Sequence, residues 1–198
     1  MEALNQALFL TLNAPAHPGP AVLWLATTLA EKLIWVIPIL IGAGWLYGGR
    51  DVRKAVIVAV VAGVAGLLAA WLIGAIWPHP RPFMVGIGHT FMHHAPNASF
   101  PSDHLTFWWS ITLSLALCRG WHRTGSVLVL LGLAIAWARV YLGVHWPFDM
   151  LGAALVAASC AGLASFAAGW YLMPIYRLAL SLHRKLFGPL IRRGWIRE

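Results

Sequence analysis

The chain has 198 residues, of which 60% are hydrophobic and 10% are charged, and its mean hydropathy is +0.74. Soluble domains carry charge on about a quarter of their residues, so this composition excludes an ordinary soluble protein and indicates an integral membrane protein. The formal net charge of +8 does not indicate nucleic-acid binding, because the basic residues form short clusters beside apolar segments, which is the pattern of membrane topology.

Residues 1–20 are weakly amphipathic and end in a proline-rich stretch. They include one acidic residue, Glu2, and no Lys or Arg. A signal peptide would begin with a basic region. We therefore expect an interfacial helix that is retained in the mature protein.

Apolar segments that approach or exceed the length needed to cross a bilayer recur along almost the whole chain. Their continuous Ala-, Leu- and Gly-rich composition favours helices over the alternating strands of a membrane barrel. We therefore predict an all-α fold, a polytopic transmembrane helical bundle that forms one membrane-embedded domain over residues 1–198. About five spans are expected, over residues 33–47, 55–77, 104–118, 124–141 and 150–171.

Two features of these spans carry specific expectations. Residues 21–47 are apolar except for Glu31 and Lys32, which either form an intramembrane ion pair or mark where an interfacial segment turns into a span that begins near residue 33. Trp108 and Trp109 lie near the outer end of the third span, where an aromatic belt would place them.

Basic clusters predict which ends of the spans face the cytoplasm. They lie in the loops 50–54 and 119–123 and in the tail 174–198. The positive-inside rule places all of them on the cytoplasmic side, with five alternating spans and an outside N-terminus. We expect the tail to be an amphipathic helix on the anionic inner leaflet. The polar interval 78–103 and the loop 143–149 then emerge together on the external face.

Three polar stretches on that face combine side chains suited to a phosphoryl group. They are 79–83 (His-Pro-Arg-Pro-Phe), 100–104 (Phe-Pro-Ser-Asp-His) and 139–149, which begins with arginine and ends in His-Trp-Pro-Phe-Asp. The guanidinium groups of Arg81 and Arg139 offer fixed forks of donors that match phosphate oxygens and stay charged at any working pH. The sequence therefore predicts a phosphoryl-binding site.

Two histidines and an aspartate complete the predicted chemistry. His145 and Asp149 are four residues apart, so they share one face if a helix begins near His145. The carboxylate can then fix the imidazole tautomer and raise its basicity, and such an imidazole is either a general base or a nucleophile. His104, at the start of the third span, could protonate a leaving oxygen.

These stretches resemble the three-part signature of the type-2 phosphatidic acid phosphatase superfamily, and most closely its bacitracin-resistance type of undecaprenyl-diphosphate phosphatase. The resemblance implies that His145 forms a phosphohistidine, that Asp149 orients it and that His104 is the general acid. It also implies cleavage of a polyprenyl diphosphate at the outer face of a bacterial inner membrane, with carrier-lipid recycling and bacitracin resistance. The implied scheme needs no metal ion and no cofactor.

The resemblance also implies which residues hold the substrate. Arg81, Arg139 and Ser102, with the backbone N–H groups around Ser102, would hold the phosphoryl oxygens. His79 and Asp103 are further candidates for binding it.

The chain departs from the superfamily pattern at three positions, and the smallest departure is Ala138, where a serine often precedes the arginine. The lysine that usually stands seven residues before the arginine is Gly74 here, so the site either lacks that cation or receives it from His79 or Lys32. Asp103 stands where glycine is common. Its carboxylate could hold a cation with a diphosphate, orient an arginine or cap the third span.

Other interpretations remain open at the level of sequence. The same chemistry could act on phosphatidylglycerophosphate, phosphatidic acid or lipid A. A transporter could instead line a pathway with these histidines and arginines, although no internal repeat is visible and the charges lie at span ends. The sequence leaves the oligomeric state open.

Overall fold

Helix α5 (Asp103–Leu117) forms the centre of the fold, in a computed structural model that describes residues 1–198. It packs against α4 (Arg50–Ile76), α6 (His122–Tyr141) and α7 (Pro147–Arg192), which surround it. With 15 residues, α5 is the shortest of the four. At 1.5 Å per residue it is only about 22 Å long, so its first turn starts inside the bundle rather than beyond its end.

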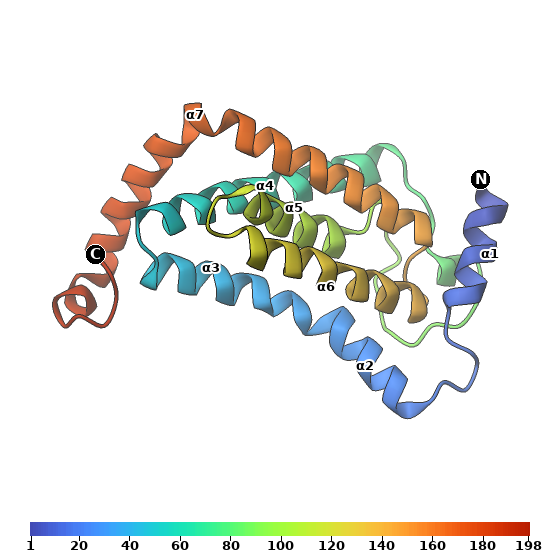
Figure 1. Ribbon diagram of the computed structural model, residues 1–198. Coiled ribbons are helices and arrows are strands. Elements are labelled where there is room, and N and C mark those ends of the chain that lie inside the picture. Colours follow the sequence, from blue (N-terminus) through green and yellow to red (C-terminus); the bar gives the residue numbers. More distant parts are fainter.

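The remaining elements lie beside this core (Figure 1). Helix α2 (Pro20–Glu31), the 3-10 turn η1 (Leu33–Trp35) and α3 (Val36–Tyr47) form one rod with a break in the middle. Helix α1 (Glu2–Leu12) lies across one end of the bundle, and a short turn, η2 (Pro82–Met84), follows α4 at the same end.

The predicted all-α membrane bundle is confirmed. Four helical segments are long and apolar enough to cross a membrane, namely Pro20–Tyr47, Arg50–Ile76, His122–Tyr141 and Pro147–Arg192. The first of them begins well before residue 33, because the chain bends at η1 without leaving the helical rod. The third predicted span corresponds to α5, which is shorter than a full crossing.

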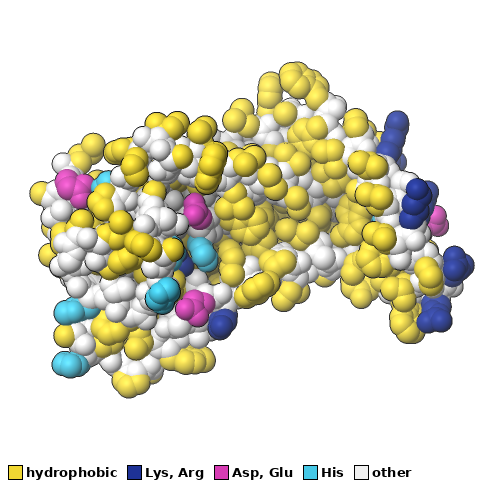
Figure 2. Space-filling model, turned by 180° about the vertical axis from the view of Figure 1, so that it is seen from behind, with side chains coloured by type: hydrophobic (Ala, Val, Ile, Leu, Met, Phe, Trp, Pro, Cys, Tyr) yellow, Lys and Arg dark blue, Asp and Glu magenta, His cyan; other side chains and the backbone are white.

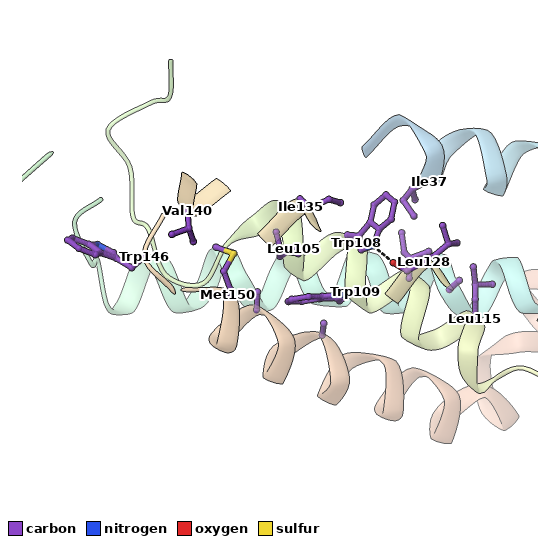
Figure 3. Packing of buried hydrophobic residues seen from close by; sticks show 14 of the residues in the cluster. Ile37, Leu105, Trp108, Trp109, Leu115, Leu128, Ile135, Val140, Trp146 and Met150 are labelled. Carbon is purple, nitrogen blue, oxygen red and sulfur yellow. Dashed lines mark hydrogen bonds between the residues drawn. The ribbon is translucent and has the colours of Figure 1, made fainter. Parts of the chain in front are cut away.

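The expectation that Trp108 and Trp109 form part of an interfacial belt is wrong. Both indoles are buried, and they fasten α5 to α6. The Nε1–H of Trp108 donates to the carbonyl of Leu128 at 2.8 Å, the bond dashed in Figure 3, and that of Trp109 donates to Val129 at 3.0 Å. A buried indole is stable in a core when its N–H has such a partner.

The tail is helical, as predicted, but it is not a separate helix. Helix α7 runs for 46 residues through Pro174 and bends along its length (Figure 1). Proline inside a helix removes a backbone hydrogen bond and kinks the axis. The last residues then return to the bundle, where Arg53 Nη2 donates to the carbonyl of Arg197 at 2.7 Å.

Charge is divided between the two ends of the molecule. Figure 2 shows most Lys and Arg side chains at one end, and His, Asp and Glu side chains gathered toward the other, with a broad hydrophobic surface between them. Apolar sides between polar ends are what a bilayer requires. The chain is therefore a multi-pass membrane protein.

Close packing between α5 and α6 depends on Gly132. A Cβ atom there would overlap the indole Nε1 of Trp109, whereas a Cβ at Gly162, in α7, would meet nothing within 4 Å. We expect Gly132→Ala to lower the thermal unfolding midpoint in detergent, because overpacking costs about 1–3 kcal/mol. Gly162→Ala should leave the midpoint unchanged or raise it slightly, since alanine favours a helix. Equal effects of the two substitutions would contradict this packing.

Candidate active site

Four ionisable side chains are buried together at the end opposite the basic clusters. Arg81 is 2% exposed, and Arg139, His145 and Asp149 are each 1% exposed. They come from the α4–α5 connection, the last turn of α6, the α6–α7 loop and the first turn of α7. Burying charge is costly unless the groups are paired, so this cluster calls for a specific set of partners.

Asp149 fixes the orientation of His145. Its Oδ2 atom lies 3.0 Å from His145 Nδ1, accepts the backbone N–H of Trp146 at 2.8 Å and also accepts the hydroxyl of Ser99. Because a carboxylate only accepts hydrogen bonds, Nδ1 of His145 carries the proton in this network. The lone pair of the ring is then on Nε2, which faces away from Asp149.

Arg81 is held beside that nitrogen by its other contacts. Its Nη1 donates to His145 Nε2 at 2.9 Å and to the carbonyl of Val144 at 2.9 Å. Its Nε and Nη2 both donate to Asn97 Oδ1, at 3.1 and 2.9 Å, and Nη2 also donates to the carbonyl of Ala98 at 3.0 Å. The guanidinium is therefore fixed in place before any ligand binds.

Arg139 also approaches His145 and keeps free donors. Its Nη2 is 3.3 Å from His145 Nε2, while its Nε and Nη1 have no hydrogen-bond partner in the protein. The buried hydroxyl of Ser102, at the N-cap of α5, has none either. Unpaired buried donors are costly. A helix N-terminus also favours an anion, so the arrangement suits a phosphoryl group.

The environment of His145 favours the neutral imidazole. Burial is the main cause that lowers its pKa well below the usual value, and the charges of Arg139 and Arg81 lower it further. The pKa of His94, whose ring lies 6.1 Å from that of His145, is lowered by its own burial. A neutral imidazole with its Nδ1–H bound by a carboxylate has a lone pair available for attack on phosphorus.

The first turn of α5 places the remaining predicted residues differently. Asp103 and His104 line a cavity of about 220 Å³ whose other walls are apolar and come from Ile34, Leu67 and Phe107. Both residues therefore open onto an apolar cavity at the start of α5.

His79 does not join the cluster. Its Nε2 is 3.6 Å from Glu2 Oε2, and its ring packs edge-on against Trp77 and Trp146, with centroids 6.3 and 6.4 Å away. His79 instead faces the N-terminal helix α1, and it lines a cavity of about 190 Å³ with Asn5 and Asp149.

Three residues with direct roles in building the site were not predicted. Asn97 holds Arg81, and Ser99 donates to Asp149. Asn5 of α1 accepts the N–H of Phe148 at 3.0 Å and so caps the start of α7. The nearest signal in the sequence was position, since 97–99 directly precede the Phe-Pro-Ser-Asp-His stretch.

Comparison with known proteins decides the family. The family model described as "PAP2 superfamily" matches residues 72–173, which include every residue of the buried cluster. The chain belongs to the PAP2 superfamily. This confirms the resemblance drawn from the three polar stretches.

Sequence matches to two relatives cover all or nearly all of this PAP2 protein. YbjG of Escherichia coli (strain K12), provisionally named an undecaprenyl-diphosphatase, is 42% identical over 100% of both chains. The undecaprenyl-diphosphatase BcrC of Bacillus subtilis (strain 168) is 30% identical over 96% of this chain and 97% of its own. The crystal structure of Aquifex aeolicus LpxE has a TM-score of 0.65 at 22% identity, over 81% of this chain and 94% of that one, and shares its fold.

The lowered pKa of His145 can be measured directly in this PAP2 protein. We expect the ¹⁵N resonances of its ring to remain those of the neutral form as the pH falls from about 7.5 to about 6, because a lowered pKa delays protonation to more acidic solution. The spectrum of His145→Ala identifies the resonances. Half-protonation at or above about pH 6.5 would show that burial and the two arginines do not act as described.

Proposed function

We propose that this chain hydrolyses undecaprenyl diphosphate to undecaprenyl phosphate and inorganic phosphate. The observation that carries the proposal is the placement of His145 Nε2, which lies 2.9 Å from Arg81 Nη1 and 3.3 Å from Arg139 Nη2. A nitrogen with an available lone pair, set between two guanidinium groups, suits attack on a bound phosphoryl group.

In the first step Nε2 of His145 attacks the terminal phosphorus. A bond forms between nitrogen and phosphorus, and the bond from that phosphorus to the bridging oxygen breaks. The departing lipid phosphate keeps the electron pair and takes a proton from His104, which must enter the step as the imidazolium to act as general acid. Asp149 stabilises the positive charge on the phosphorylated ring through its contact with Nδ1.

In the second step water attacks the phosphohistidine. His104 takes a proton from the water, the bond between nitrogen and phosphorus breaks, and its electron pair returns to Nε2. Inorganic phosphate leaves and both histidines return to their starting states. Through both steps Arg81, Arg139 and Ser102 would bind the phosphoryl oxygens as negative charge develops on them, and the N–H groups at the start of α5 would add to this binding.

The identity of the lipid is supported by the relatives and by the cavity. BcrC of Bacillus subtilis, which is 30% identical over nearly the whole chain, is named an undecaprenyl-diphosphatase. The apolar cavity beside His104 would accept the first part of a hydrocarbon chain. Consumption of this lipid would recycle the carrier for cell-wall synthesis and remove the target of bacitracin.

The division of charge supports an outward-facing site. The basic loops and tail gather at the end opposite the buried cluster, as the positive-inside rule requires of cytoplasmic ends. We therefore place the protein in the bacterial inner membrane, with the site on its outer face, residues 174–198 on the cytoplasmic side and residues 1–198 acting as one domain.

Phosphate release from a panel of lipids tests this function. We expect undecaprenyl diphosphate to be hydrolysed with a higher kcat/KM than phosphatidic acid, phosphatidylglycerophosphate or lipid A. His145→Ala should reduce the rate by about 10⁴-fold or more, because the nucleophile is lost. His17→Ala removes an exposed histidine at the same end and serves as the matched control.

Two results would contradict the proposal. The first is a preference for one of the monophosphate lipids over undecaprenyl diphosphate. The second is a His145→Ala variant with the same rate as His17→Ala, which would mean that the buried histidine takes no part in the chemistry.

A further inference from the structure

Glu31 and Lys32 lie at the break between α2 and η1. Helix α2 ends at Glu31, and Lys32 is its C-cap residue. Lys32 is one of the few basic side chains outside the cytoplasmic clusters, together with Arg81 and Arg139; all other Lys and Arg residues lie in 50–54, 119–123 and 177–197. The positive-inside rule therefore does not account for its position.

Neighbours on both sides place this pair beside the site. Ala30 is 1% exposed and packs in a cluster with Ala138, the residue before Arg139. Ile34 lines the cavity that Asp103 and His104 also line. Glu31 and Lys32 stand between Ala30 and Ile34 in the chain, so the break in the rod brings them close to the site.

The ammonium group of Lys32 is available for a ligand. Its Nζ is 3.9 Å from Glu31 Oε2, and the two side chains are 72% and 41% exposed. A pair this long and this exposed contributes little. Charges at membrane depth are expensive in hydrocarbon and are kept where they face a cavity or a substrate path. Lys32 stands two residues before Ile34, which lines such a cavity.

The buried cluster alone supplies too little positive charge for a diphosphate. Its two guanidinium groups are offset by one carboxylate, and Asp103 adds a second carboxylate nearby. No cation comes from the α4 side, where Gly74 lines a cavity of about 290 Å³ with Asp103. His79 is turned toward Glu2. Lys32 is the remaining Lys or Arg side chain at this end of the molecule.

We propose that Lys32 binds the second, lipid-linked phosphate of the substrate and so makes the site select diphosphates over monophosphates. The inference rests on the proposed function, in which the terminal phosphate lies between Arg81 and Arg139. A lysine is a mobile point charge, and it suits a phosphate whose negative charge increases as the anhydride bond to the terminal phosphate breaks. Lys32 is thus a specificity-determining residue.

Kinetics with farnesyl diphosphate and farnesyl monophosphate test this role. Lys32→Gln should raise the KM for the diphosphate about 10- to 100-fold, the loss of one charge-assisted contact, and should leave kcat/KM for the monophosphate within about twofold. Lys32→Arg should restore most of the selectivity. Lys185 is an exposed lysine at the opposite end, so Lys185→Gln is the matched control and should leave the kinetic constants for both substrates unchanged.

Equal losses with both substrates would overturn the proposal, since they would indicate a structural or general electrostatic effect. Unchanged selectivity in Lys32→Gln would also overturn it, while leaving the proposed function intact. A wild-type protein that hydrolyses the monophosphate but not the diphosphate would instead contradict the proposed function itself.

Discussion

The site depends on two buried guanidinium groups that share one imidazole nitrogen. Arg81 and Arg139 both reach Nε2 of His145, while Asp149 holds the opposite ring nitrogen. Two cations in an apolar setting repel each other and lose hydration, so the fold must hold them by other contacts. Asn97 and two backbone carbonyls do this for Arg81. Arg139 keeps donors without protein partners, which leaves the cluster complementary to an anion.

Helix ends bring the parts of this cluster together. The first turn of α7 supplies Asp149, the last turn of α6 supplies Arg139 and the start of α5 supplies Ser102. Because α5 is short and central, its N-terminus opens within the bundle, where apolar walls surround it. Helix α1 also takes part, because the side chain of its Asn5 caps the start of α7. A buried cluster that suits a phosphoryl group thus results from where the helices begin and end.

Part of the buried cluster could be predicted from the sequence because its residues stand at short, regular spacings. The pair His145 and Asp149 is set by the helical repeat, and the arginines stand out as charges in an apolar chain. The partnership of Asn97 with Arg81 spans sixteen residues of irregular loop and has no local periodicity to reveal it. The length and apolar character of the segments predicted the bundle. They did not predict that Trp108 and Trp109 are buried, because an indole whose N–H has a backbone acceptor is as stable in a core as at an interface.

We propose that His145 carries the phosphoryl group between two chemical steps. The most direct test of this proposal is rapid acid-free quenching of the enzyme with substrate labelled at the terminal phosphate, followed by peptide mapping. The account predicts a label on the peptide containing His145, stable to alkali and labile to acid, and lost in His145→Ala. A label on another residue, or product release in single turnover with no labelled protein at any time, would contradict it.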